Sequence, residues 1–288
     1  MSNKVFVTEC PRDAMQGIKE FIPTELKIKY LQQLLSVGFD YLDFGSFVSA
    51  KAIPQMQDTS KVLEGLDISK SSSKLLAIIA NTRGAEDALQ YEKVSYLGFP
   101  LSVSETFQQR NTNASIQDAL QRVEEIQNLC VKTNTKLRVY LSMAFGNPYN
   151  EEWRVDKVVA LAEQLNKLGI QDIALADTIG CSDTENITYL FTNLIKEFSS
   201  VKWIAHLHST PDKSKEKIEA AIKSGCTYFD SAIMGFGGCP MAKDDLTGNI
   251  ATEKLIDVIQ AKKLEISINT DALKQAQTTA LEIFNAYH

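Results

Sequence analysis

The stretch from Gly169 to Asp177 reads GIQDIALAD and decides how we interpret the chain. It begins with a glycine that suits the left-handed position after a helix. It then rises through an apolar run to an aspartate. Two other joints, GFDYLD at Gly38–Asp43 and GCTYFD at Gly225–Asp230, repeat this order. We therefore expect a recurring unit of a helix, a glycine, a buried strand and a carboxylate at the strand's carboxyl end.

Working outward from these joints, short runs rich in β-branched and aromatic residues alternate with amphipathic segments of helical length. We expect strands at Val5–Glu9, Tyr41–Phe44, Lys74–Ile79, Lys93–Leu97, Leu137–Ser142, Asp172–Ala176, Trp203–Leu207 and Tyr228–Ser231. We expect helices at Thr24–Val37, Met56–Leu63, Arg83–Leu89, Ser115–Lys132, Val155–Leu168, Thr184–Phe198, Lys213–Ser224, Thr252–Lys262 and Thr270–Ala286.

Eight strand–helix units in 288 residues fit an α/β protein with a closed (β/α)8 TIM barrel and one additional C-terminal helix. The alternative is an open doubly wound sheet, which usually carries phosphate-binding glycines after its first strand. Here that turn reads ECPRDAMQ over Glu9–Gln16, with charges in place of glycines. No Pro-, Gly- or Ser-rich linker divides the chain, so we predict a single barrel domain over residues 1–288.

The composition excludes several classes of protein. Hydrophobic residues make up 44% and charged residues 23%, as in soluble globular proteins. A net charge of −6 argues against a nucleic-acid or membrane partner, because both need a positive field. No apolar run approaches the ~20 residues of a membrane span, and the N-terminus lacks the apolar core of a signal peptide. The five cysteines are widely spaced, so we expect free thiols and a cytoplasmic location.

Two of the three histidines, His206 and His208, stand at the end of the seventh predicted strand. Alternate residues of a strand face the same side, ~7 Å apart, so both imidazoles point to one place at the barrel mouth. Asp13 and Asn249 follow the first and eighth strands, which neighbour the seventh in a closed barrel. Two nitrogens and two oxygens suit Mg²⁺, Mn²⁺, Co²⁺ or Zn²⁺. The alternative is a pair of polar caps on a strand end.

Arg12 is a second candidate, because an arginine at the mouth suits a carboxylate or enolate oxygen. Its alternative role is an ion pair with Glu9 or Asp43. We expect no pair between Arg12 and Asp13, because adjacent side chains rarely face each other.

The third candidate is the glycine-rich loop Met234–Ala242, which suits a mobile lid carrying the thiol of Cys239. A plain loop cysteine is the alternative. Asp43, Asp177 and Asp230 end three strands and suit bases or supports for other site residues.

With these residues the chain resembles the 3-hydroxy-3-methylglutaryl-CoA (HMG-CoA) lyases, in the superfamily of metal-dependent lyases and Claisen-type synthases. Four segments carry the resemblance: ECPRDAMQG at 9–17, GSFVSAKAIPQMQD at 45–58, ADTIG at 176–180 and GFGGCPMAKDDLTGNIATE at 235–253. The second and fourth are the most specific to the lyases. The histidine pair also stands where the family has its own.

The resemblance implies a role for each of these residues. Asp13, His206, His208 and Asn249 would bind a divalent metal, with Mg²⁺ or Mn²⁺ expected. Arg12 would stabilise an enolate, Cys239 would be the acid/base thiol, and His206 and Asp43 would complete the catalytic set. Gln16, Ser46 and Asn81, with Arg12, would line the substrate site, and Glu9 and Asp177 would support it.

The implied reaction cleaves HMG-CoA to acetoacetate and acetyl-CoA, a step that the family usually performs in leucine degradation. We expect an acyl-CoA substrate and a homodimer. The alternatives are a Claisen condensation, cleavage of another 3-hydroxyacyl-CoA, or a barrel that binds acyl-CoA without turnover. The chain departs from the family at Ala14 (usually glycine), at Asp43 (usually glutamate) and within Ser209–Pro211 (where an acidic residue is common), and its lid from Cys239 to Asn249 is one residue longer. These departures bear on substrate choice and rate.

Overall fold

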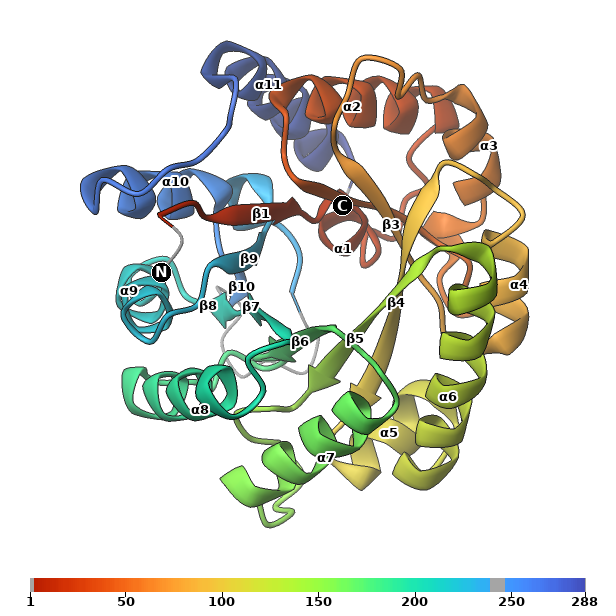
Figure 1. Cartoon of the computed structure of the whole chain (residues 1–288). Helices are drawn as coiled ribbons and strands as arrows, with labels where there is room; N and C mark the ends of the chain where they lie inside the picture. Colours follow the sequence, from red (N-terminus) through yellow and green to blue (C-terminus); the bar gives the residue numbers. More distant parts are fainter. Residues whose placement is uncertain (1–2, 239–246, 288) are drawn as a thin grey trace.

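A computed structural model describes residues 3–238 and 247–287 and shows eight parallel strands closed into a barrel (Figure 1). The closure is direct, because β1 (Phe6–Glu9) pairs with both β2 (Tyr41–Ser46) and β9 (Tyr228–Ser231). The remaining barrel strands are β3 (Lys74–Ile78), β4 (Val94–Ser102), β5 (Lys136–Ser142), β6 (Asp172–Ala176) and β7 (Lys202–His206). The predicted (β/α)8 barrel is confirmed, and the open doubly wound sheet is wrong.

The helices form the outer ring, except for the short α1, which directly follows β1 at the barrel mouth (Figure 1). They are α1 (Pro11–Met15), α2 (Thr24–Val37), α3 (Thr59–Gly65), α4 (Thr82–Ala88), α5 (Glu105–Thr112), α6 (Ile116–Thr133), α7 (Val155–Lys167), α8 (Thr184–Glu197), α9 (Ser214–Lys223), α10 (Thr252–Ala261) and α11 (Thr270–Ala286). The predicted C-terminal helix is α11, which packs against α2 (Figure 1). Short 3-10 turns occur at Pro54–Met56 and Ile233–Gly235. No helix in the described ranges is long and apolar enough to cross a membrane.

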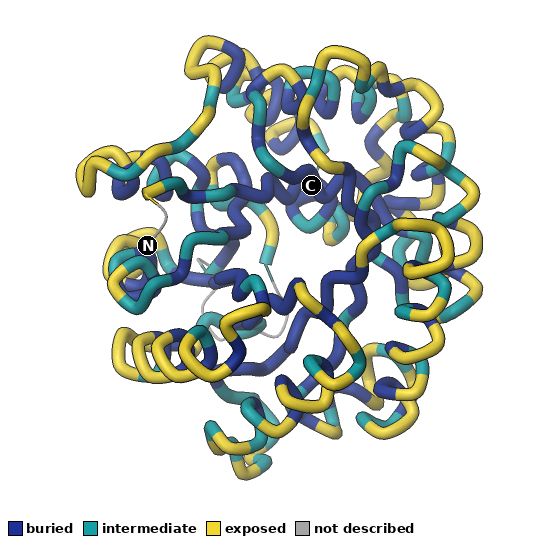
Figure 2. Tube along the Cα trace, in the orientation of Figure 1, coloured by how far each residue is buried: buried dark blue, intermediate teal, exposed yellow. Residues whose placement is uncertain are grey.

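Alternation along the strands divides the buried residues into two cores. Side chains such as Val7, Leu42 and Leu97 face outward and pack against the helices. Figure 2 shows this buried ring of strands inside a rim of exposed helix surface. The inward-facing set is smaller and includes Tyr41 and Tyr96, with Arg138 fully buried beside them. A charged side chain therefore lies inside the barrel among the inward-facing tyrosines.

The structure adds elements that the sequence patterns did not predict. α5 is polar, with only Phe107 and Gln108 buried, so it lacks the apolar period of a helix. β4 continues to Ser102, beyond the predicted end at Leu97. A two-stranded antiparallel ribbon joins β8 (His208–Ser209) to β10 (Gly248–Asn249), and His208 lies directly opposite Asn249. This ribbon brings the last predicted metal ligand beside the histidine pair.

Candidate active site

The four predicted metal ligands lie together at the barrel mouth. Ligand atoms of Asp13, His206 and His208 are all within 4.8 Å of one another. The Nδ2 atom of Asn249 donates to Oδ2 of Asp13 at 2.7 Å. Asp13 comes from α1, the histidines from β7 and β8, and Asn249 from β10. Residues 236 positions apart in the chain therefore share one hydrogen bond.

Both imidazoles are oriented by contacts at their Nδ1 atoms. Nδ1 of His206 lies 3.1 Å from Oδ2 of Asp230, and Nδ1 of His208 lies 3.2 Å from the carbonyl oxygen of Thr178. With oxygen acceptors at both Nδ1 atoms, we assign the proton there, which leaves the Nε2 lone pairs for a ligand. Nε2 of His208 is buried and has no partner in the described part of the chain.

The charge state of the cluster also suits a cation. Burial raises the pKa of Asp13, but Arg12 and the two histidines outweigh it and lower the pKa to about 2. Burial, followed by the neighbouring His206, lowers the pKa of His208. Near neutral pH the cluster therefore offers an ionised carboxylate and a neutral imidazole. Nitrogen and oxygen donors with an unpartnered buried lone pair fit a divalent cation.

Arg12 lies in a closed set of ion pairs. Its Nε atom donates to both carboxylate oxygens of Asp43, at 3.2 and 3.1 Å, so Arg12 makes the ion pair with Asp43 that was considered as its alternative role. Its Nη1 atom donates to Asp13 and to Oε1 of Gln16, each at 2.9 Å. The prediction that Arg12 and Asp13 do not pair is wrong. Both residues lie in the short helix α1, where the long arginine side chain folds back onto its neighbour.

Glu9 is not a partner of Arg12. Its carboxylate accepts from the backbone N–H of Ile233 at 2.7 Å and from Oγ1 of Thr252 at 2.6 Å. Glu9 therefore holds the start of the glycine-rich loop against α10. Burial raises the pKa of Glu9 to about 8, although both hydrogen bonds oppose this shift.

Asp43 has a carboxyl group that suits a general base. Burial raises its pKa to about 6, and Arg12 opposes the shift. The residue is 1% exposed and lies behind the Arg12 guanidinium. A carboxyl group with a pKa near neutrality at a site is typical of proton transfer.

A buried ion pair lies directly beneath the histidines. Nη1 of Arg138 donates to Oδ1 of Asp230 at 3.2 Å and to Oγ1 of Thr8 at 2.9 Å. Burial raises the pKa of Asp230. Arg138 and His206 lower this pKa by more than burial raises it, so the net shift is downward. Arg138 was missed from the sequence. The available signal was a charged residue in the middle of the apolar run KLRVYLS.

Asp177 supports His208 through a lysine. It accepts from Nζ of Lys217 at 2.8 Å, and the same Nζ donates to the backbone carbonyl of His208 at 2.8 Å. Asp177 is thus linked to His208 through Lys217, a residue that no sequence pattern singled out. A buried carboxylate paired in this way holds the strand end that carries the histidine.

The cluster opens into a cavity of about 420 Å³. Arg12, Asp13, Gln16, His206 and His208 form its polar side. Its lining also includes the apolar residues Val48, Ala52, Ile53, Ile78, Ala80, Pro100 and Phe107. A cavity with a few convergent polar groups facing an apolar wall is typical of a small-molecule site.

Ser46 and Asn81 do not line this cavity. They line an adjoining hollow of about 380 Å³, which meets the first at Val48. Oδ1 of Asn81 accepts from the N–H of Gly84 at 2.9 Å and so caps α4. Oγ of Ser46 donates to the carbonyl of Ile78 at 3.2 Å. Neither side chain is brought to the metal ligands.

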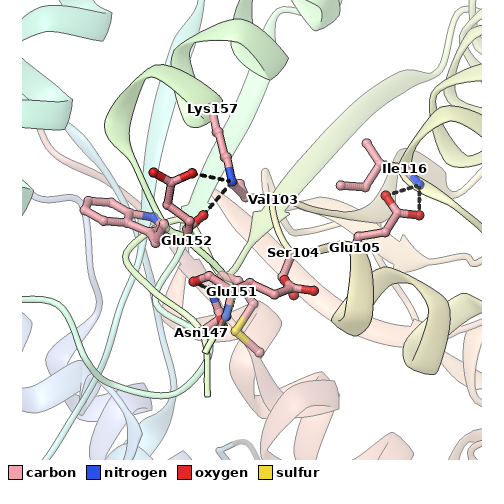
Figure 3. Close-up of a pocket in the computed structure, with 10 residues that line it drawn as sticks. Val103, Ser104, Glu105, Ile116, Asn147, Glu151, Glu152 and Lys157 are labelled. Atoms are coloured by element: carbon pink, nitrogen blue, oxygen red, sulfur yellow. Dashed lines mark hydrogen bonds and ion pairs between the residues drawn. The ribbon is translucent and has the colours of Figure 1, made fainter. Parts of the chain in front are cut away.

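A third hollow, of about 280 Å³, lies over the loops after β4 and β5 (Figure 3). Its charged groups are already paired. Lys157 contacts Glu152, and Glu105 accepts from the backbone N–H of Ile116. No histidine lines it. It therefore lacks the convergent, unpartnered donors of the main cavity.

Cys239, and most of the lid whose length differs from the family, lie outside the described residues. The loop before the lid packs on the predicted metal ligands. A Cβ atom on Gly237 would lie 2.8 Å from the carbonyl oxygen of Asp13 and 2.9 Å from Nδ2 of Asn249. Gly237 also has a φ of +85°. Only glycine allows this approach without strain.

The profile of the HMGL-like family matches residues 5–280, nearly the whole chain. The chain belongs to the HMGL-like family. A hydroxymethylglutaryl-CoA lyase of Bacillus subtilis is 32% identical over 274 residues, which are 95% of this chain and 91% of that protein. A 3-hydroxy-3-isohexenylglutaryl-CoA/hydroxymethylglutaryl-CoA lyase of Pseudomonas aeruginosa is 31% identical, over 92% of this chain and 88% of that one.

Solved structures of this family have the same fold. An HMG-CoA lyase from Acinetobacter baumannii, in complex with coenzyme A and 3-methylmalate, superposes with a TM-score of 0.91 at 30% identity. The match covers 99% of this chain and 92% of that one. An HMG-CoA lyase from Bacillus subtilis gives a TM-score of 0.92 at 31% identity, over 99% and 96% of the two chains.

Proposed function

We propose that this HMGL-like protein is a divalent-metal-dependent carbon–carbon lyase that cleaves HMG-CoA to acetoacetate and acetyl-CoA. The observation that carries the proposal is the convergence of Asp13, His206 and His208 beside Arg12 in the lining of one cavity, with Asn249 hydrogen-bonded to Asp13. The named lyase relatives support it. So does the related structure that holds coenzyme A with 3-methylmalate, which like the substrate carries a hydroxyl group and a carboxylate.

Asp13, His206, His208 and Asn249 would hold the metal, for which we propose Mg²⁺ or Mn²⁺. When bound, the cation supplies a Lewis acid that lowers the pKa of the substrate's tertiary hydroxyl. The two imidazoles are held in place by Asp230 and Thr178 before substrate arrives. The site is therefore preorganised, which reduces the reorganisation needed during reaction.

Cleavage needs a proton acceptor and a stabilised enolate. Asp43, with a pKa of about 6, suits the acceptor near neutral pH, and Arg12 must shift aside for a substrate proton to reach it. When the C2–C3 bond breaks, its electron pair moves onto the thioester. Nη2 of Arg12 carries two N–H groups. One of them donates to Asp43, and the second remains to donate to the enolate oxygen.

The carbanion must then receive a proton, and we propose the thiol of Cys239 as its donor. Gly238, the preceding residue, lines the cavity. A thiol titrates near ~8.5 and exchanges protons close to neutral pH. A closed lid would also keep bulk water from the intermediate.

The decisive experiment is an acetoacetate assay on purified protein stripped of metal and then supplied with Mg²⁺ or Mn²⁺. We expect metal-stimulated release from HMG-CoA. The panel should include 3-hydroxyacyl-CoA esters with larger 3-substituents, and acetyl-CoA with 2-oxo acids. Release from another ester alone, or condensation without cleavage, would replace the proposed reaction. Binding of CoA esters without product from any of them would indicate a non-catalytic barrel.

We also propose that the protein is a cytoplasmic homodimer. Light scattering after size-exclusion chromatography tests the dimer, because a monomer of 32.0 kDa and its dimer are well separated in mass. A fluorescent fusion observed in cells tests the location.

A further inference from the structure

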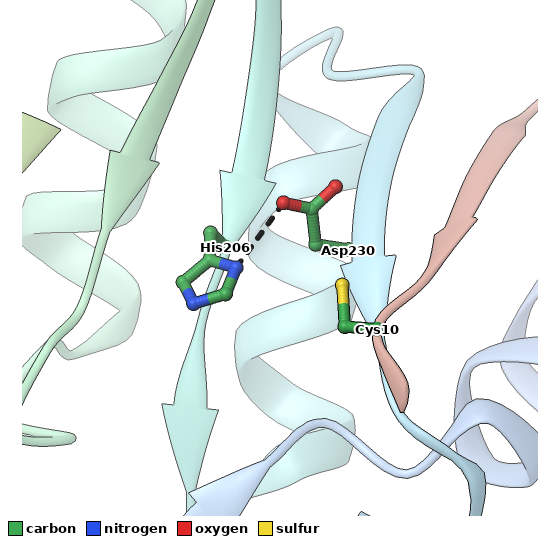
Figure 4. A group of neighbouring side chains, drawn as sticks. All are labelled: Cys10, His206 and Asp230. Atoms are coloured by element: carbon green, nitrogen blue, oxygen red, sulfur yellow. Dashed lines mark hydrogen bonds and ion pairs between the residues drawn. The ribbon is translucent and has the colours of Figure 1, made fainter. Parts of the chain in front are cut away.

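A second group of metal-ligating side chains lies beside the first. Cys10 follows β1, His206 ends β7 and Asp230 lies in β9, and their ligand atoms are all within 4.8 Å of one another (Figure 4). They are 1%, 8% and 2% exposed. The proposed lyase reaction uses the imidazole of His206 but gives no role to the thiol of Cys10.

The His206 ring stands between the two groups. Its Nδ1 atom faces Oδ2 of Asp230 at 3.1 Å, on the same side as Cys10 (Figure 4). Its Nε2 atom is the one left to bind the metal of the proposed lyase site. Arg138 occupies Oδ1 of Asp230, at 3.2 Å, so Oδ2 is the oxygen turned toward the cluster.

The surroundings of the thiol favour a cation over a free thiolate. Within the described residues the sulfur makes one weak hydrogen bond, to the carbonyl of Thr8 at 3.7 Å. Burial raises the pKa of Cys10, and the carboxylates of Asp230, Asp43 and Asp13 raise it further. The same negative field that opposes an unpaired thiolate attracts a divalent ion.

We propose that Cys10, His206 and Asp230 form a binding site for a thiophilic divalent cation such as Zn²⁺ or Cd²⁺, and that this cation competes with the lyase metal for His206. Sulfur ligands select soft cations, whereas Mg²⁺ prefers oxygen and would remain at the Asp13 site. Bond lengths of ~2.0–2.3 Å require side-chain shifts on the order of 1 Å. The competition rests on the proposed function, but the sulfur site does not.

The chemistry of binding balances without an oxidant. The S–H bond of Cys10 breaks, its proton passes to solvent, and the sulfur lone pair forms the bond to the cation. Nδ1 of His206 gives up its hydrogen bond to Asp230 and binds the cation with its lone pair. The imidazole proton then resides on Nε2, which can no longer bind the lyase metal.

The test is a Cd²⁺ titration of metal-free, full-length protein carrying Cys181→Ala and Cys239→Ala, so that neither the exposed thiol nor the lid thiol contributes. We expect thiolate-to-cadmium charge-transfer absorption that saturates at one equivalent. Cys10→Ser, which keeps the size of the side chain, should lose the band and bind Cd²⁺ at least ~10-fold more weakly. Cys10→Ala provides a second variant if the serine form does not fold.

The matched control is Cys226→Ala, which removes a thiol that is 2% exposed and donates to the backbone carbonyls of Trp203 and Tyr228. It should keep the band. Absence of the band in the parent, or its persistence in both Cys10 variants, would overturn the sulfur site.

Competition is read separately, from Mn²⁺ released into solution and followed by electron paramagnetic resonance. Cd²⁺ should release Mn²⁺ from the parent near one equivalent and need at least ~10-fold more in Cys10→Ser. A full cadmium band without Mn²⁺ release would overturn the sharing of His206. If Mn²⁺ does not bind at all, the proposed lyase metal site fails, while the cadmium band still decides the sulfur site.

Discussion

Replacing Arg138 by methionine should unfold the barrel more easily and weaken its hold on metal. The substitution roughly keeps the length of the side chain and its contact with the Tyr41 ring, whose centroid lies 4.7 Å from the guanidinium carbon. It removes the hydrogen bonds to Asp230 and Thr8. Asp230 then remains as a carboxylate that is 2% exposed and has His206 as its main partner.

The size of the effect follows from this burial. Removing one partner of a buried ion pair costs about 3–5 kcal/mol, because the other charge stays buried. The remaining bond to His206 places the expected loss near the lower end, about 3 kcal/mol. A loss of that size lowers the melting temperature by roughly 6 °C for a chain of this length. A less firmly held Asp230 should weaken Mn²⁺ binding by ~10–100-fold through His206.

Urea unfolding of the metal-free protein measures the first effect and calorimetric Mn²⁺ titration the second. The double variant Arg138→Met/Asp230→Asn should recover most of the lost stability, because no charge remains buried, but not the metal affinity. Arg154→Ala is the surface control. Its ion pair with Asp156 has partners 55% and 66% exposed, so the loss should stay below ~1 kcal/mol. A loss under ~1 kcal/mol in Arg138→Met, or a double variant less stable than the single one, would refute the reasoning.

Four further outcomes are expected. Arg12→Gln should lower kcat by ~10²–10³-fold with little change in KM, because the charge it meets forms mainly in the transition state; unchanged turnover would remove Arg12 from the mechanism. Cys239→Ser should lose turnover but keep its metal content, whereas Cys130→Ser, in α6, should behave like the parent; equal activity of both would leave Asp43 or His206 as the better candidate for the proton carrier. His208→Ala should abolish stoichiometric Mn²⁺ binding in calorimetry, and retained binding would exclude it as a ligand. Because Glu9 has a pKa of about 8 when folded, it binds its proton more tightly than the unfolded chain does. Stability should therefore fall as the pH rises from about 4.5 to about 8, by up to ~1.4 kcal/mol per pH unit, and Glu9→Gln should flatten this slope in urea unfolding at pH 5, 7 and 9.

Much of the architecture could be predicted from local patterns. The glycines that follow helices and the apolar runs that follow glycines located the eight barrel strands within a few residues, except the far end of β4. Closure of the barrel followed from the number of units. It also placed Asp13, the two histidines and Asn249 at one mouth, because the carboxyl ends of parallel strands lie on one side. The α5 helix escaped prediction because its polar sequence has no apolar period.

The sequence by itself determined which residue types stand at the strand ends, because period-2 and helical patterns depend only on near neighbours. Only the tertiary structure decided how those side chains pair. Arg12 turned toward both Asp43 and Asp13, and Asn81 was drawn away to cap α4. Arg138 meets Asp230 across 92 positions of sequence. Such pairs depend on rotamers and on burial, since an unpaired charge inside the barrel is too costly to persist, and no local periodicity records which partner satisfies it.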